Sequence, residues 1–548
     1  MRLCRSVLYG RVLIDLAVKS HPNAYYSNGM KATKNKWPTL IRNLLAPEFY
    51  DHPVGKFIVI ETHISYVILT GGYAYKIKKP VDLGFVNFST LAKRRFYCHE
   101  EIRLNQRLAP ELYLGVVTVR GSEDKPHLGG GGTIIEYAVK MRQFALDQQL
   151  DSFVLTHTLA MRTAEDFAAS LAEFHAGAAR APADSDYGSN RVQRKHIMDN
   201  FAQTCDCARR WHCWDAHRSL KEWCDTMLAR LKPRFVQRVA NGFVRECHGD
   251  LHLGNLALID GRITAFDCLE FNPTLRWIDV ISEIAFLDMD LRLHGLNGLA
   301  NRFLNKYLEH GGDYSGIALL SLFRVYRAMV RAKVACLRTG QAGASALVRD
   351  FIDHVTLAQR FAGQGSQRAL IITHGLSGSG KTTLTDQLLD RFEAIRIRSD
   401  VERKRLFPIQ EGTGRDQRGR YSPAAIERTY AHLLKQAEPG LAAGHTVILD
   451  ATFLRSAQRG EAARLAGHVG VPFIILDVRA PEEVLRGRIN ARLSAGRDAS
   501  EATSDVLTAQ QRNREALTVA EQGSAIKLCS DQPIDFAQLA VDIGDRRG

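Results

Sequence analysis

A glycine-rich stretch between a strand and a helix constrains the fold of this chain more than any other feature. Residues 369–373 are strand-like, residues 375–382 follow the pattern G-x-x-x-x-G-K-T, and residues 383–389 continue as a helix. Glycines in such a loop let backbone N–H groups face an anion, and a helix N-terminus favours negative charge. The sequence therefore predicts a phosphate-binding loop that joins a strand of a sheet to a helix.

The residues of this loop have distinct expected roles in binding ATP. We expect Lys381 to reach the β- and γ-phosphates and Thr382 to offer its hydroxyl to Mg²⁺. The other residues are expected to surround the phosphates with backbone groups. The predicted nucleotide-binding residues are Gly375, Leu376, Ser377, Gly378, Ser379, Gly380, Lys381, Thr382 and Thr383.

The sequence beyond the loop alternates between strands and helices, which predicts an α/β domain with a parallel sheet. In such sheets, ligands collect beyond the carboxyl ends of the strands. One predicted strand ends at Asp450, which we expect to face the metal ion, and residues 395–398 form another that leads into a helix at Asp400. We predict that Asp400 is the base on the acceptor side and that Arg403 helps to place the acceptor or the transferred phosphate. The alternative is that Ser399 or Asp400 only caps the helix.

A later predicted helix, which opens at Pro481, carries a cluster of arginines. Arg488 and Arg492 lie four residues apart and therefore share one face of this helix. We expect this face to close on the transferred phosphate as an arginine lid. The alternative is a basic face that only contacts solvent.

A second pattern lies at residues 248–255, which read H-x-D followed five residues later by Asn. This is the spacing of the catalytic loop of kinases. In that loop the Asp, here Asp250, orients and deprotonates an acceptor hydroxyl, and the Asn, here Asn255, holds a metal ion. The alternative is a buried structural histidine with two solvated acids.

The residues that follow this loop predict a tight β-hairpin. Two short apolar runs, residues 256–259 and 262–266, are joined by Asp260-Gly261, which is a strong hairpin signal. A hairpin returns the chain to its starting point, so we expect Asp267 to lie beside Asn255. Two oxygen ligands for Mg²⁺ would then converge near the catalytic loop.

Upstream of this pattern, three strand-like runs end in a segment with two lysines. Lys76 and Lys78 share one face of the last strand because side chains alternate along a strand. The A-x-K pattern favours Lys76 as the phosphate-binding lysine, with Lys78 as the alternative. An amphipathic helix is expected at residues 90–108, and we expect its Glu101 to anchor the lysine, with Glu100 as the alternative.

Residues 55 to about 345 resemble the aminoglycoside phosphotransferase family, whose kinase-like fold also includes choline kinases. Like most of that family, the chain lacks the G-x-G-x-x-G loop of protein kinases. The resemblance implies ATP-dependent phosphorylation of a hydroxyl group, but it does not identify the acceptor. The matching residues are Lys76, Glu101, His248, Asp250, Asn255 and Asp267.

Residues 369 to about 530 resemble small P-loop kinases of the gluconate kinase, polynucleotide 5′-kinase and zeta-toxin type. The whole arrangement resembles a bacterial family of fused aminoglycoside-phosphotransferase-like and ATP-binding kinase proteins, which implies no settled substrate. The matching segments are the glycine-rich loop, Arg398-Ser399-Asp400 with Arg403, residues 450–453 and the arginine-rich helix.

These observations predict an α+β bilobal kinase-like domain followed by an α/β P-loop NTPase domain with a parallel sheet. At 548 residues, the chain is long enough for several domains. We expect a disordered extension at residues 1–36, the kinase-like domain at 37–360, a linker at 361–368 and the P-loop domain at 369–548.

The composition narrows the partners and the location. A formal net charge of +14 suits a protein that handles polyanionic nucleotides. We find no basic helix interleaved with aromatic residues, so we do not expect nucleic acid as a partner. No apolar run approaches the roughly 18 residues that span a bilayer. Nothing in the sequence indicates an oligomeric state.

The ten cysteines show no disulfide framework, which is typical of a reducing cytoplasm. Some of them cluster, but the C-x-C spacing in this cluster is not a usual zinc pattern. We therefore expect a cytoplasmic protein without bound zinc. The clustered residues are Cys205, Cys207, His212, Cys213 and Cys224.

The sequence thus predicts two ATP- and Mg²⁺-using phosphotransferase domains that act on small-molecule hydroxyl acceptors. One alternative is that the P-loop domain phosphorylates the ends of nucleic acids. Another is that one domain binds nucleotide without turnover and controls its neighbour.

Overall fold

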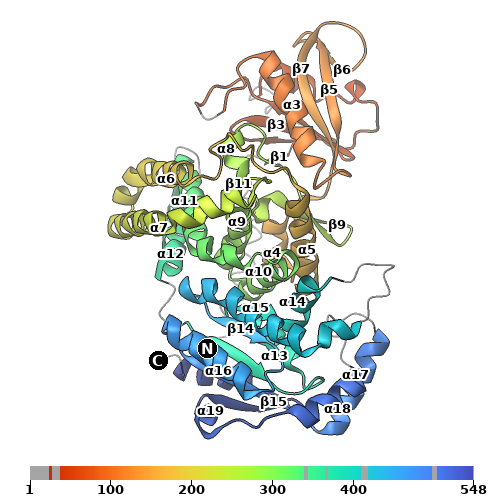
Figure 1. Cartoon of the computed structure of the whole chain (residues 1–548). Coiled ribbons are helices and arrows are strands. Elements are labelled where there is room, and N and C mark those ends of the chain that lie inside the picture. The colour runs from red at the N-terminus through yellow and green to blue at the C-terminus, as the bar shows by residue number, and fades with distance from the viewer. Residues whose placement is uncertain are drawn as a thin grey trace, which may run out of the picture.

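The computed structural model describes residues 24–26, 37–84, 86–338, 344–363, 368–408, 417–495 and 503–546. Figure 1 shows three regions in chain order: an antiparallel sheet with one long helix, a body of helices, and a second sheet surrounded by helices. The catalytic-loop pattern lies in the first half of this arrangement and the glycine-rich loop in the last region.

The first sheet has seven strands in the order β1-β2-β3-β4-β7-β5-β6, and all its pairings are antiparallel. Helix α3 packs against strands β5 and β7. The bounds are β1 Ala24–Tyr26, β2 Ile58–Glu61, β3 Ser65–Leu69, β4 Tyr73–Lys78, β5 Tyr113–Gly121, β6 Pro126–Leu128, β7 Ile134–Arg142 and α3 Leu91–Asn105.

Within residues 1–36, for which the sequence predicts a disordered extension, the structure describes the short strand β1. Its three residues, Ala24–Tyr26, pair with Ile58–Ile60 of β2, so the hydrogen bonds of the ladder hold this piece of the chain. The rest of the predicted extension lies outside the described residues.

The helical body surrounds helix α9, in which every residue from Val280 to Arg292 is buried. Its carboxylates and its arginine are paired with other groups, which is what burial of charge requires. The described residues also form two short two-stranded sheets: β8 with β11, which contacts α9, and β9 with β10, which contacts α4 and α5. The bounds in this body are α4 Leu150–Thr156, α5 Met161–Gly177, α6 Asn190–Arg210, α7 Trp214–Ala240, β8 Val244–Glu246, β9 Leu256–Ile259, β10 Arg262–Ala265, α8 Pro273–Arg276, β11 Trp277–Asp279, α9 Val280–Leu293, α10 Asn297–Gly311, α11 Leu320–Leu337 and α12 Ala344–Gly363. Helix α2, Thr39–Asn43, instead packs in the core of the first sheet.

The last region is a five-stranded sheet in the order β13-β14-β12-β15-β16, in which all neighbouring strands are parallel. Strand β13 therefore forms one edge. The predicted α+β domain followed by an α/β domain with a parallel sheet is confirmed. The bounds are β12 Leu370–His374, α13 Lys381–Leu389, β13 Ile395–Arg398, α14 Ser399–Leu406, α15 Pro423–Ala442, β14 Val447–Asp450, α16 Ser456–Val469, β15 Phe473–Arg479, α17 Glu482–Ala495, α18 Ser504–Asn513, α19 Val519–Gly523, β16 Ala525–Cys529 and α20 Phe536–Asp545.

The predicted linker at residues 361–368 is partly helical. Helix α12 continues to Gly363, and the Phe361 side chain is buried in the core of the helical body. An aromatic ring of this size stabilises the structure when it is buried, so the helix extends past the predicted boundary. Residues 364–367 lie outside the described residues, and the remaining domain boundaries stay predictions.

The sequence predicts no disulfide framework, but the structure contains a disulfide. Cys207 of α6 and Cys336 of α11 form a disulfide, with their Cα atoms 6.2 Å apart. The 129 residues that separate them in sequence hide this contact from any spacing pattern. Cys205, Cys213 and Cys224 are free thiols. In the part of the chain that the structure describes, no helix combines the length and apolar character that crossing a membrane requires.

Candidate active sites

The catalytic-loop pattern lies between strand β8 and the hairpin β9–β10. The Asn255 side-chain amide donates to the Asp250 carboxylate over 3.0 Å and to the Asp250 backbone carbonyl over 3.0 Å. In the hairpin, Leu256 pairs with Ala265, and the N–H of Phe266 donates to the Asn255 carbonyl over 3.0 Å. The hairpin therefore brings Asp267, the next residue, to the loop, as its turn sequence indicates.

Lys76 lies in a chain of charges beside this hairpin. Its Nζ is 2.8 Å from Glu101 Oε1 and 2.5 Å from Asp267 Oδ1. The alternative lysine, Lys78, also pairs with Glu101, over 2.6 Å, and it contacts Glu270. The alternative anchor, Glu100, instead pairs with the arginines Arg103 and Arg276. The structure thus brings Lys76, Glu101 and Asp267 together, while their roles in a reaction stay predictions.

The electrostatics of the first site favour ionised carboxylates. Burial opposes ionisation of Glu101, but the ammonium groups of Lys76 and Lys78 outweigh it and lower the pKa of Glu101 to about 2. Burial also opposes ionisation of Asp250, yet the neighbouring His252 and Arg331 hold the pKa of Asp250 below its usual range. Both carboxylates are therefore negatively charged at neutral pH.

His252 was missed by the sequence reasoning, although it lies only two residues after Asp250. Its Nδ1 accepts the N–H of Gly254 over 3.1 Å, and its Nε2 is 3.5 Å from Asp250 Oδ2. The Nη1 atom of Arg331 lies 3.3 Å from the same Nε2, so the ring contacts the loop backbone, the Asp250 carboxylate and a guanidinium. The imidazole therefore supports the orientation of Asp250 in the loop.

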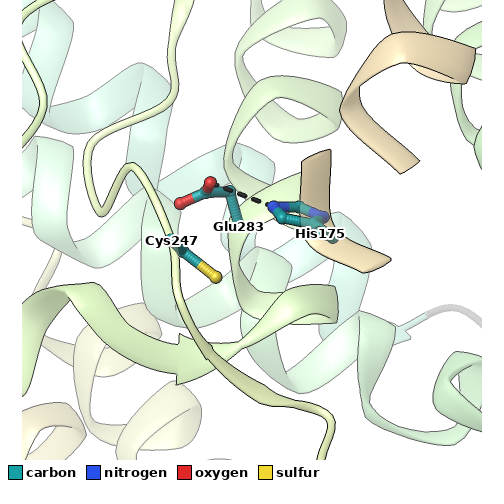
Figure 2. Close-up of side chains that lie close together, drawn as sticks. All are labelled: His175, Cys247 and Glu283. Atoms are coloured by element: carbon teal, nitrogen blue, oxygen red, sulfur yellow. Dashed lines mark hydrogen bonds and ion pairs between the residues drawn. The ribbon is translucent and has the colours of Figure 1, made fainter. Parts of the chain in front are cut away.

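A buried cluster of His175, Cys247 and Glu283 lies behind the catalytic loop (Figure 2). Glu283 accepts the backbone N–H groups of His248 over 2.8 Å and of Gly249 over 2.7 Å, and it lies 3.2 Å from His175 Nε2. His175 Nδ1 is in turn 2.8 Å from the Tyr307 hydroxyl.

These contacts occupy the oxygens of Glu283 with hydrogen bonds to the loop and to His175. Burial opposes its ionisation, but the hydrogen bond with His175 and the charges nearby lower the pKa of Glu283 to about 2. A carboxylate held in this way fixes the backbone of the catalytic loop. The geometry supports this role for the cluster rather than the binding of a metal ion.

The second site is a cavity of about 700 Å³ in the parallel-sheet domain. Six of the nine predicted nucleotide-binding residues line it; Gly375, Leu376 and Ser379 do not. Those three instead contact Lys381, whose Nζ is 3.0 Å from the Gly375 carbonyl and 2.8 Å from the Leu376 carbonyl. Burial lowers the pKa of Lys381 to about 8. The other predicted residues that line the cavity are Asp400, Arg403, Asp450, Arg488 and Arg492.

One glycine of the loop is required by the backbone and by its neighbours. Gly378 has a φ of +81°, and a Cβ there would lie 2.7 Å from the Leu485 carbonyl of helix α17. Glycine alone adopts this conformation without strain. The loop therefore packs directly beneath the helix that carries the arginine cluster.

Asp400 and Asp450 occupy the ends of two neighbouring parallel strands. Helix α14 begins at Ser399 with Arg398 at its N-cap, so neither Ser399 nor Asp400 takes the capping position that was the alternative. The Asp400 carboxylate accepts a hydrogen bond from Arg403 Nη1 over 2.9 Å. Asp450 Oδ2 accepts from the Thr385 hydroxyl over 3.3 Å.

Helix α18 contributes residues that the sequence reasoning missed. The Gln510 amide oxygen accepts the N–H of Ser377 over 2.8 Å, and its nitrogen donates to the Ser377 hydroxyl over 3.0 Å.

Arg488, expected in an arginine lid, donates to the Ser530 hydroxyl over 2.8 Å and to the Ser530 carbonyl over 2.8 Å. No sequence motif marks Gln510 or Ser530, because they lie more than 100 residues beyond the loop.

The oxygen atoms at both sites suit Mg²⁺, which prefers carboxylate, hydroxyl and amide oxygens. In the first site the Asn255 amide donates with its nitrogen, which leaves its oxygen for a cation, and the Asp267 side chain is 44% exposed. In the second site Thr382 and Asp450 line the same cavity. These donor sets fit the ion that the sequence implies.

Relatives that match most of the chain occur in mycobacteria. An uncharacterized protein of Mycobacterium bovis is 32% identical over 481 residues, which cover 84% of this chain and 92% of the relative. One of Mycobacterium tuberculosis gives the same values. The chain belongs to the family of these proteins. In this member of the family, residues 370–517 match the AAA domain family, and these residues include the cavity of the second site.

Solved kinase structures resemble parts of this family member. A choline/ethanolamine kinase family protein from Mesorhizobium loti is 10% identical with a TM-score of 0.34, and the match covers 59% of this chain and 98% of that chain. A sugar kinase from Janibacter is 22% identical with a TM-score of 0.25, and the match covers 33% of this chain and 95% of that chain.

Proposed function

We propose that the chain is an ATP-dependent phosphotransferase with two separate nucleotide sites, each of which phosphorylates a hydroxyl group of a small molecule. The observation that carries the proposal is that residues with three different expected roles line one cavity, the second site. They are Lys381 for the phosphates, Asp450 for the metal ion and Asp400 for the acceptor. A cavity of about 700 Å³ lies within the usual range for small-molecule sites.

In the second site, the P-loop backbone and Lys381 would hold the phosphates of ATP, and Thr382 and Asp450 would hold Mg²⁺. When bound, Mg²⁺ neutralises charge that develops on the phosphoryl oxygens. Asp400 would accept the proton of the acceptor hydroxyl, and Arg403, 2.9 Å away, would place the acceptor or the transferred group. Arg492 and Arg488 would spread the negative charge of the transition state.

In the first site, Lys76 would hold the phosphates of ATP and Glu101 would orient Lys76. Asn255 and Asp267 would hold Mg²⁺, and Asp250 would orient and deprotonate the acceptor hydroxyl. The short distances from Lys76 to Glu101 and Asp267, 2.8 Å and 2.5 Å, support this assignment. Support also comes from Asp250, whose pKa lies below its usual range, so that it stays ionised as a base requires.

We further propose a cytoplasmic location and a small-molecule acceptor in place of nucleic acid. The cysteine usage supports the location, since the free thiols outnumber the single disulfide among the described residues. The volume of the second site, about 700 Å³, supports the acceptor class because it suits a small molecule.

The test is a screen of sugars, amino alcohols and nucleosides as acceptors for the full chain in the presence of ATP and Mg²⁺. The readout is the release of ADP. Asp250→Asn should lower turnover at the first site by roughly 10²–10⁴-fold, and Asp400→Asn should do so at the second, because each loses its base. Both variants should retain ADP binding. A full-chain double variant that transfers phosphate at the wild-type rate would contradict the proposal.

A further inference from the structure

Three elements of the P-loop domain meet beside the second site: helix α13, which follows the glycine-rich loop, and the neighbouring parallel strands β13 and β14. Each contributes one buried polar side chain. Thr385 of α13 is completely buried, while Arg396 of β13 and Asp450 of β14 are 7% and 5% exposed. Buried polar groups need partners inside the protein, so the contacts among these three residues determine how each is oriented.

Thr385 lies one helical turn after Thr382, the residue that we expect to offer its hydroxyl to Mg²⁺. The Thr385 hydroxyl lies 3.0 Å from the Thr382 carbonyl and 3.3 Å from Asp450 Oδ2. Thr382 and Asp450 both line the cavity, whereas Thr385 lies behind them and does not line it. A single buried hydroxyl therefore contacts both residues that we expect to hold the cation.

Arg396 limits the directions that the Thr385 hydroxyl can take. Its Nη1 donates to Thr385 Oγ1 over 3.1 Å and to Asp386 Oδ1 over 2.6 Å. A guanidinium only donates, so the Thr385 oxygen accepts from it, and the single hydroxyl hydrogen remains for Thr382 or Asp450. A hydrogen bond to a carboxylate is stronger than one to a carbonyl. This difference favours Asp450 as the acceptor.

We infer that Thr385 is a positioning residue of the second site: its hydroxyl holds Asp450 Oδ2, so that Oδ1 of the same carboxylate can bind Mg²⁺. This inference rests on the proposed function of the second site. A residue behind a metal ligand fixes the orientation of that ligand and thereby raises the affinity for the metal. Arg398 Nε also lies near Asp450 Oδ2, but their distance of 3.9 Å is too long for a hydrogen bond.

The alternative is that the Thr385 hydroxyl only satisfies a carbonyl of its own helix, as threonines in helices often do. Thr429 of helix α15 is an example of this ordinary case in the same domain. It is also completely buried, and its hydroxyl donates over 2.7 Å to the Ala425 carbonyl, one turn earlier. Because Thr429 does not line the cavity, it provides a matched control.

The experiment measures the Mg²⁺ concentration that half-maximally tightens ADP binding to the full chain. The parent protein carries Lys76→Met, which removes the phosphate-binding lysine of the first site, so that the titration reports the second. Thr385→Val keeps the size of the side chain and removes its hydroxyl. It should raise this Mg²⁺ midpoint by about tenfold, as loss of a residue behind a metal ligand usually does. ADP affinity in EDTA should not change, because Thr385 lies outside the cavity.

Two further variants separate the hydroxyl from the packing around it. Thr385→Ser keeps the hydroxyl and should have a Mg²⁺ midpoint close to that of the parent. Thr429→Val removes a hydroxyl that is equally buried and should leave the midpoint unchanged. Both valine variants should lower the melting temperature, because each loses a buried hydrogen bond. The midpoint, and not the melting temperature, therefore distinguishes positioning of Asp450 from a structural role.

Three results would overturn the inference. One is a Thr385→Val protein with the parent's Mg²⁺ midpoint. Another is an equal shift in Thr429→Val, which would assign the effect to general loosening of the domain. The third is a Thr385→Ser protein that shifts as much as Thr385→Val, which would assign the effect to the shape of the side chain. A parent protein whose ADP binding ignores Mg²⁺ would instead refute the proposed second site itself, and the inference with it.

Discussion

Glu101 is the residue at which the charges of the first site meet. Its two carboxylate oxygens bind different lysines, Lys76 over 2.8 Å and Lys78 over 2.6 Å. The sequence places both lysines on one face of a strand and favours Lys76 only through the A-x-K pattern. The structure separates them by their third partners, because Lys76 reaches Asp267, whose side chain is 44% exposed, while Lys78 reaches the buried Glu270.

Replacing each lysine by methionine should therefore give different defects. The Lys78 side chain is completely buried between two carboxylates, so Lys78→Met should lower the free energy of unfolding by about 3–5 kcal/mol, the usual cost of breaking a buried ion pair. Lys76→Met should mainly weaken ADP binding at the first site. Urea unfolding and ADP titration of both variants check this. Equal free energies of unfolding for Lys76→Met and Lys78→Met would contradict this distinction between the two lysines.

The residues predicted from sequence share one property, which is that a local pattern marks them. Asp267 follows a hairpin whose turn is predicted by Asp260-Gly261, and Lys381 follows the glycines of its loop. The missed residues lack such a pattern. Gln510 contacts Ser377 and Glu309 contacts Arg398 from segments far away in sequence, and these contacts depend on the packing of the whole chain.

The contacts between helices and strands were the part of the fold that the sequence predicted least well. Strands β8, β11 and β16 are short or lie apart from any turn signal, and the sequence reasoning did not identify them. Helix α6 contacts α11 through Cys207 and Cys336, which belong to segments 129 residues apart. Long loops of this kind carry no spacing rule, unlike the disulfides of small secreted domains.

The disulfide gives a prediction about these two helices. Closing a loop of 129 residues restricts the unfolded chain, and typical disulfides stabilise proteins by about 2–4 kcal/mol. Oxidised protein should therefore resist urea more than reduced protein by that amount, and Cys336→Ser should remove the difference. Peptide mapping under non-reducing conditions identifies the pair. Recovery of Cys207 and Cys336 as separate, unlinked peptides after mild oxidation would contradict it. The expected absence of zinc at the neighbouring cysteines stays a prediction that metal analysis can check.

The whole molecule is less divided than its sequence indicates. The sequence predicts two domains joined by a linker, and each does have its own sheet. One hydrophobic core nevertheless contains residues of both, from Leu304 in the helical body to Leu370 and Ile395 in the parallel sheet. Asn301, Arg302 and Glu309 of helix α10 add polar contacts to the P-loop domain.

This shared core bears on how the two sites can be tested. Cutting the chain between the domains would expose apolar side chains and the edge of strand β13, which favours aggregation. The two sites are therefore best separated by point variants in the full chain, in which the interface remains intact.

The central claim is that one chain holds two nucleotides at once, and counting bound ADP by equilibrium dialysis with Mg²⁺ tests it most directly. The wild-type chain should bind two ADP molecules. Lys381→Ala should bind one, because the P-loop loses the cation that holds the phosphates, and Lys76→Met should bind one for the corresponding reason at the first site. A wild-type chain that saturates with a single ADP, or a Lys381→Ala chain that binds none, would contradict the account.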